Sequence, residues 1–238
     1  MKIRNSLSKI FIFTLVALLS GRALACENLF SHPITASELK QMSKLLVNSN
    51  PLQTQFEQTR KLAILKRPLK SSGRVSFSPK RGVIWQQQKP FKTTLILQAN
   101  SLTQVNSQGQ VSVITGGESN TISELLSPVM NGMFTGNIAA LQESFDLYFQ
   151  NDVDKEYWLL GLIPKNNLAK KAFSSIVIRG DNIATKSEFS IQTIVLTSNA
   201  IKNKKSDVTT IRFIEPQTHS LGKNDLQLFE LSSSNSVL

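Results

Sequence analysis

The stretch GRVSFSPKRGVIW, residues 73–85, decides the fold class of this chain. Small or apolar residues alternate with polar ones up to the tetrapeptide Pro79-Lys80-Arg81-Gly82, and the apolar residues Val83-Ile84-Trp85 follow it, which is typical of two antiparallel strands joined by a turn. The alternation places four apolar side chains on one face of the predicted hairpin: Val75, Phe77, Val83 and Trp85. This face is either the core of an ordinary domain or the wall of a cavity that holds an apolar ligand.

The period-two pattern extends in both directions from this hairpin. A long strand is predicted over residues 52–64, and further strands follow the hairpin over 92–98, 101–106 and 111–114. A second series of strands is predicted over 146–150, 157–163, 175–179, 188–197 and 207–215. Short turns join most of these runs, so the sequence predicts one curved antiparallel sheet of about ten or eleven strands, mainly β in class, that curls into an incomplete barrel.

Helical segments are few and are expected to cover this sheet. A helix is predicted over 33–47, where Thr35 and Glu38 have the spacing of a capping box. Others are predicted over 121–134, divided near Pro128, over 138–145, and around 167–173. The segment 216–238 is polar and serine-rich, so we expect an edge strand over 226–231 followed by a frayed tail.

The first 25 residues have the features of a secretory signal peptide. A basic start is followed by the apolar run 10–19 and by Ala23-Leu24-Ala25, a small-x-small cleavage site. The predicted organisation is therefore a signal peptide over 1–25, one domain over 26–215 and the polar segment 216–238. The signal carries four basic and no acidic residues, so its removal lowers the net charge from +11 to +7. A basic exported protein is expected to meet anionic lipid, glycan or an acidic protein.

Cys26 is the only cysteine and directly follows the cleavage site, so it cannot form an internal disulfide. It is either a free thiol at the start of the mature chain or the attachment point of a lipid anchor. A lipidation signal would favour a large aliphatic residue three positions before the cysteine and a small one two positions before. Ala23 and Leu24 stand there in the reverse order, which favours ordinary cleavage.

The sequence shows no pattern of a known catalytic or metal centre. One cysteine and two histidines, His32 and His219, give no zinc-ligand spacing, and neither a G-x-S-x-G elbow nor a P-loop occurs. We therefore predict neither an enzyme nor a metal or other cofactor. The export signal argues against a nucleic-acid partner.

The order of these elements resembles that of the periplasmic lipoprotein carrier LolA and its LolA-like relatives. The matching residues are Phe56-Glu57-Gln58-Thr59, then Gly73, Val75, Phe77, Pro79 and Trp85. Residues 159–165, 168–170, 174–182 and 207–213 look like the second half of that family. The resemblance covers most of the mature chain.

This resemblance implies an incomplete β-barrel whose sheet and helices enclose an apolar cavity for the acyl chains of a lipoprotein. It also implies loading by an inner-membrane ABC transporter and delivery to an outer-membrane acceptor. An arginine near the hairpin bend would hold the empty state closed. Here Ser78 precedes Pro79 and the cations follow it, so Arg81 is the candidate latch in a different register. The residues expected to line the cavity are Phe56, Val75, Phe77, Val83, Trp85, Leu95, Leu97, Met130, Met133 and Phe134.

Three functional hypotheses follow from the sequence. The first is a soluble, monomeric periplasmic carrier of lipoproteins or of another lipid. The second is a lipidated outer-membrane acceptor of the related LolB type, anchored through Cys26. The third is a periplasmic module that uses the same half-barrel to bind a protein.

Overall fold

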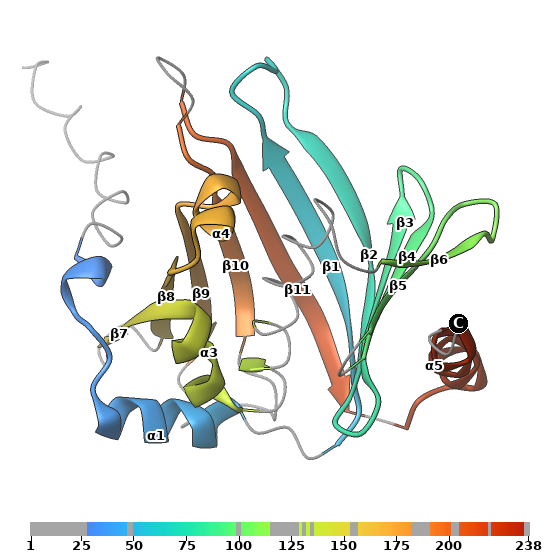
Figure 1. Cartoon of the computed structure of the whole chain (residues 1–238), viewed down its shortest axis with the longest axis horizontal. Coiled ribbons are helices and arrows are strands. Elements are labelled where there is room, and N and C mark those ends of the chain that lie inside the picture. The colour runs from blue at the N-terminus through green and yellow to red at the C-terminus, as the bar shows by residue number, and fades with distance from the viewer. Residues whose placement is uncertain are drawn as a thin grey trace, which may run out of the picture.

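The fold was analysed in a computed structural model, which describes residues 28–46, 50–98, 101–114, 129, 132–133, 136–152, 157–181, 191–200, 205–218 and 220–235. An eleven-stranded antiparallel sheet forms the body of the molecule (Figure 1). Its strand order is β6-β5-β4-β3-β2-β1-β11-β10-β9-β8-β7. The strands are β1 (Leu52–Lys61), β2 (Leu69–Ser78), β3 (Gly82–Lys89), β4 (Thr93–Gln98), β5 (Ser101–Val105), β6 (Val111–Ile114), β7 (Phe145–Asp152), β8 (Tyr157–Pro164), β9 (Ser175–Asp181), β10 (Ile191–Thr197) and β11 (Val208–Thr218).

Two consecutive meanders make up this sheet. Strands β1 to β6 follow one another in space as in sequence, and so do β7 to β11. The meanders join where the first strand pairs with the last, with Phe56 opposite Phe213. The edges β6 and β7 do not close on each other, so the sheet is an open half-barrel. The predicted fold class is confirmed.

The helices are α1 (Ala36–Leu46), α3 (Ile138–Ser144), α4 (Asn167–Ala172) and α5 (Lys223–Asn235), with a 3-10 turn, η1, at Leu29–Ser31. The capping box predicted for α1 is present: the Thr35 N–H donates to Glu38 Oε2 at 2.8 Å, and the Glu38 N–H donates to Thr35 Oγ1 at 3.3 Å. Asn137 caps α3 by accepting from the Ala140 N–H. Three expected helices are therefore confirmed, whereas most of the helix predicted over 121–134 lies outside the described residues.

The edge strand predicted over 226–231 is wrong, because this segment lies inside helix α5. Strand β11 also continues past Pro216 to Thr218 instead of ending at residue 215. The side chains of α5 that are buried deepest are Asp225, Phe229 and Ser232, spaced four and three residues apart. Two of these three are polar, so the apolar period of 3.6 that would have indicated a helix does not appear in the sequence.

The two faces of the sheet carry separate apolar cores. We call the inner face the one that packs in a single large core with Met42 and Leu46 of α1 and with Ile138 and Leu141 of α3. The outer face carries a smaller core around Ile84, Ile96 and Phe229 of α5. In Figure 1, α1 and α3 accordingly lie on the lower side of β7 to β10 and α4 at their upper end, whereas α5 lies apart from them, beside the strands of the other half.

Candidate functional site on the inner face

Strand register brings six of the predicted cavity residues into two rows that cross three strands. Val75 of β2 lies opposite Trp85 of β3, which lies opposite Leu95 of β4. The next row consists of Phe77, Val83 and Leu97. Directly opposed residues of antiparallel strands share one face of a sheet, so all six side chains lie on the inner face. The predicted strand parity of Leu95 and Leu97 is thereby confirmed.

An aromatic cluster continues this face into the centre of the sheet. The Phe56 ring on β1 lies 4.1 Å from the Trp85 ring, centroid to centroid. Trp85 in turn meets Phe213 of β11 edge to face at 6.3 Å. Phe213 was not among the residues predicted from the sequence, although it alternates with Ile211 along the strand predicted over 207–215.

The helical cover of this face includes two flexible methionine side chains. Met42 of α1 and Met133 are fully buried in the same core as Phe56, Val75, Phe77 and Val83. Methionine is unbranched and polarisable, so it fills irregular space and rearranges at little cost. The contacts that these two methionines make therefore depend on apolar area.

The rim of the two rows is less completely covered than their centre. Trp85, Leu95 and Leu97 are half-buried, whereas Val75 and Phe77 are 1% and 2% exposed. Within these two rows, solvent therefore comes nearest to the apolar wall at Trp85 and on β4.

Three further sequence predictions can be placed only in part. Arg81 lies in the β2–β3 turn, where its backbone N–H donates to the Ser78 carbonyl at 3.2 Å and its side chain is exposed. Its role as a latch stays a prediction. Met130 and Phe134, expected in the cavity wall, and Cys26, the possible lipidation site, lie outside the described residues.

The outer face of the same strands has a different chemistry. The Asp225 carboxylate of α5 is 1% exposed and accepts from Arg74 Nη2 at 2.9 Å, from Ser76 Oγ at 2.9 Å and from Gln53 Nε2 at 2.7 Å. Charge-assisted hydrogen bonds of this kind are short and directional. They attach the first turn of α5 to β1 and β2.

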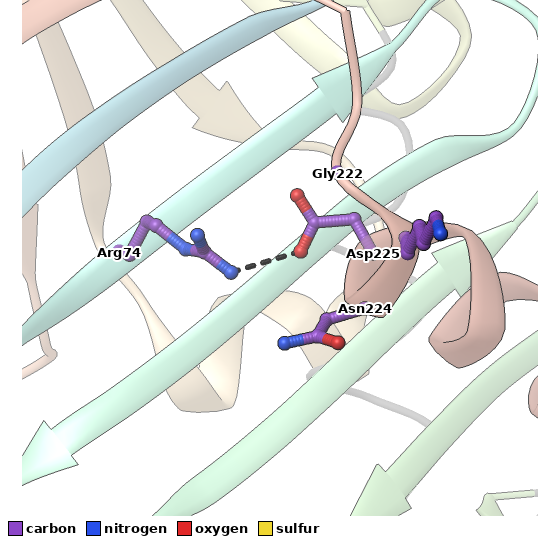
Figure 2. A pocket seen from close by; sticks show the side chains of 5 residues that line it. Arg74, Gly222, Asn224 and Asp225 are labelled. Atoms are coloured by element: carbon purple, nitrogen blue, oxygen red, sulfur yellow. Dashed lines mark hydrogen bonds and ion pairs between the residues drawn. The ribbon is translucent and has the colours of Figure 1, made fainter.

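Figure 2 shows the surface pocket beside this ion pair, which has a volume of about 210 Å³. Arg74 and Asp225 point toward each other across it, and Gly222, Lys223 and Asn224 complete its wall. Because the buried carboxylate and the guanidinium already satisfy each other, we interpret this pocket as the junction between α5 and the sheet and not as a ligand site.

Within the described residues, no three His, Cys, Asp or Glu side chains come together as a metal site would require. In the same part of the chain, no helix combines the length and the apolar character needed to cross a bilayer.

Comparison with known proteins gives similarity at the level of structure only. No family model and no curated protein matches the sequence. A LolA superfamily protein from Nitrosomonas europaea is similar at 11% identity and a TM-score of 0.41, with 80% of this chain and 96% of that one covered. A putative outer membrane lipoprotein-sorting protein domain from Vibrio parahaemolyticus is similar at 12% identity and a TM-score of 0.43, with 82% and 97% covered.

A third similar structure is the Pseudomonas aeruginosa MucA/MucB complex, at 11% identity and a TM-score of 0.32, with 79% of this chain and 58% of that one covered. At these identities and TM-scores the similarities carry no argument about a ligand or a partner, for which the geometry of the inner face is the only guide.

Proposed function

We propose that this chain is a periplasmic carrier that holds the acyl chains of lipoproteins, or of a related lipid, between the inner face and its helices, and ferries them from the inner to the outer membrane. The observation that carries the proposal is the pair of purely apolar rows across β2, β3 and β4 under a methionine-containing cover. Each acyl CH₂ removed from water contributes about 0.8 kcal/mol, so a long chain binds tightly without any polar contact.

Loading requires that the ligand replace cover side chains. Directional bonds would oppose this exchange, but apolar contacts made by Met42 and Met133 are replaced by equivalent contacts with an acyl chain. Movement of a helix away from the sheet would expose the wall, as lids do in other binding proteins. Release then follows when an acceptor offers the acyl chain a comparable apolar environment.

The two tryptophans of the chain allow a direct test. Trp85 belongs to the proposed wall, whereas Trp158 of β8 is fully buried and donates its ring N–H to the Asp181 carbonyl at 3.1 Å. Six strand pairings separate β3 from β8. Brominated fatty acid is titrated into Trp158→Phe, in which only Trp85 emits, and into Trp85→Phe, in which only Trp158 emits.

We expect strong quenching of Trp85 and weaker quenching of Trp158, with competition by unbrominated fatty acid. Unchanged Trp85 emission in folded protein would contradict acyl binding at β2 to β4. Intact-mass analysis of the mature chain separates the carrier from a LolB-like acceptor, because a lipid adduct on Cys26 would support anchoring. Mass spectrometry of lipids that co-purify with the exported protein then identifies the cargo.

A further inference from the structure

The connection between β1 and β2 combines exposed apolar side chains with a high density of positive charge. We call residues 60–70, RKLAILKRPLK, the basic–apolar hairpin; it includes the ends of both strands. It carries five Lys or Arg and neither Asp nor Glu. In Figure 1 its loop projects beyond the ends of the neighbouring strands, in cyan at the top of the view.

Large apolar side chains are exposed at this end of the sheet far more than elsewhere. Ile64 is 72% exposed, Leu65 44% and Leu69 48%. Phe91, 74% exposed, lies in the β3–β4 turn at the same end, because Ser72 near the start of β2 pairs with Lys89 at the end of β3. Thus four of the five large apolar side chains exposed in the described residues lie at this end of the sheet, three of them in the hairpin itself, and exposed apolar groups concentrated in this way mark an interaction surface.

The loop has a defined conformation. The Leu65 N–H donates to the Leu62 carbonyl at 3.0 Å, which closes a turn with Ile64 near its tip. The Ala63 N–H donates to Asp207 Oδ1 at 2.7 Å, which ties the loop to the start of β11. This carboxylate is thus engaged with the backbone. Ile64 and Leu65 are therefore held outward by the fold.

Positive charge around the hairpin exceeds the negative charge that the Asp207 carboxylate brings to it. From Gln58 to Gly117 the sequence has ten Lys or Arg and no Asp or Glu. Arg74 is paired with Asp225, and Lys80 and Arg81 lie at the opposite end, in the β2–β3 turn. The remaining seven belong to the hairpin end of the sheet: Arg60, Lys61, Lys66, Arg67, Lys70, Lys89 and Lys92.

We propose that the basic–apolar hairpin docks this protein on the surface of an anionic phospholipid bilayer, with Ile64 and Leu65 entering the interface and the flanking cations contacting lipid phosphates. Apolar groups ringed by Lys and Arg are the combination that binds such surfaces. A projecting tip suits a deformable interface, whereas a protein partner would need a broad, complementary surface with a packed core. The hairpin lies outside the inner face, so this inference does not rest on the proposed acyl-chain function.

Vesicle flotation tests the proposal. Purified protein carrying Cys26→Ser, which cannot hold a lipid anchor, is mixed with vesicles of phosphatidylcholine alone or of phosphatidylcholine with phosphatidylglycerol. We expect binding to the anionic vesicles only. Neutralising Lys66 and Arg67 as Lys66→Gln/Arg67→Gln should lower the partition coefficient about 25-fold at low salt, at roughly fivefold per charge.

The matched control is Lys40→Gln/Lys44→Gln, which removes the same charge from two exposed cations of α1, at the opposite end of the molecule in Figure 1. It should leave vesicle binding nearly unchanged. For the apolar contribution, Ile64→Ser/Leu65→Ser should weaken binding about tenfold. Leu231→Ser, at the exposed apolar residue of α5, is its control.

If the hairpin variant and its charge-matched control lost vesicle binding equally, binding would depend on net charge alone, and the proposal would be overturned. So would unchanged binding of Ile64→Ser/Leu65→Ser, because insertion would then play no part. Absence of binding to either vesicle type would also overturn it and leave an acidic protein surface as the partner. Retained quenching of Trp85 by brominated fatty acid in the hairpin variants would show that docking and acyl binding are separate properties.

Discussion

Strands β2, β3 and β4 are covered on both faces, and the two covers are held by different kinds of contact. On the inner face, Val75, Trp85 and Leu97 belong to or pack against an apolar core that includes Met42 and Met133. No directed bond is among the contacts described above for these residues. On the outer face, Ser76, Ile84 and Ile96 alternate with them and are fully buried under α5. There the cover is attached at both ends by polar groups, through Asp225 and through Ser232, whose Oγ lies 2.6 Å from Thr103 Oγ1.

This difference separates an exchangeable cover from a fixed one. Apolar contacts have no preferred partner, so a ligand can replace them at little net cost. Buried hydrogen bonds with specific geometry are costly to leave unmade. We therefore expect α5 to remain on the sheet throughout any loading cycle, while the helices of the inner face move.

The largest effect is expected from Phe229→Ala on the outer face. Phe229 is 1% exposed and packs against Ile84 and Ile96, so its truncation should lower the free energy of unfolding by about 4 kcal/mol. Urea denaturation measures the change. Leu231→Ala, at a residue 37% exposed on the same helix, should cost far less. A small loss for Phe229→Ala would mean that α5 is not an integral part of the fold.

Met42→Ala tests the inner cover in the same way. Met42 is fully buried, and its truncation should destabilise the empty protein by about 3 kcal/mol. An acyl ligand can fill the space left behind, as apolar ligands fill apolar cavities. Saturating fatty acid should therefore stabilise Met42→Ala more than it stabilises the parent protein, and Phe229→Ala only as much as the parent. If fatty acid stabilised the parent protein, Met42→Ala and Phe229→Ala equally, the inner and outer covers would not differ in how readily a ligand replaces them.

The sequence allowed prediction of the inner face but not of the outer cover. The inner face could be predicted, because an alternation such as Val75-x-Phe77 or Val83-x-Trp85 states directly which side chains share a face. Helix α5 could not, because Asp225 and Ser232 are buried polar residues whose partners, among them Arg74 and Thr103, lie far away in the chain. Only the folded sheet brings those partners together.

The pairing of Phe56 with Phe213 escaped prediction for a related reason. The strand over 207–215 was expected, but a meander pattern does not show that the last strand returns to the first. That closure depends on contacts between residues more than 150 positions apart, such as the bond from Thr54 Oγ1 to the Ile214 carbonyl at 2.9 Å. Local turn chemistry carries no information about it.

Asp225→Asn is the smallest of the three expected effects and tests whether the outer cover is held by directed bonds. An amide replaces one acceptor with a donor, so either Arg74 or Gln53 would face an N–H group where it now finds an oxygen. We expect a loss of about 2 kcal/mol in the free energy of unfolding. It should stay below the loss for a bare buried charge, because Arg74 is 35% exposed and can turn to water.

The matched control for this substitution is Asp146→Asn, which makes the same chemical change in a surface pair. Asp146 is 55% exposed and lies 3.7 Å from Lys165 Nζ, so the loss there should be less than about 0.5 kcal/mol. A double-mutant cycle with Arg74→Met isolates the contribution of the Arg74–Asp225 pair. If Asp225→Asn cost no more than Asp146→Asn, apolar packing of Phe229 alone would hold α5, and the outer cover would be as exchangeable as the inner one.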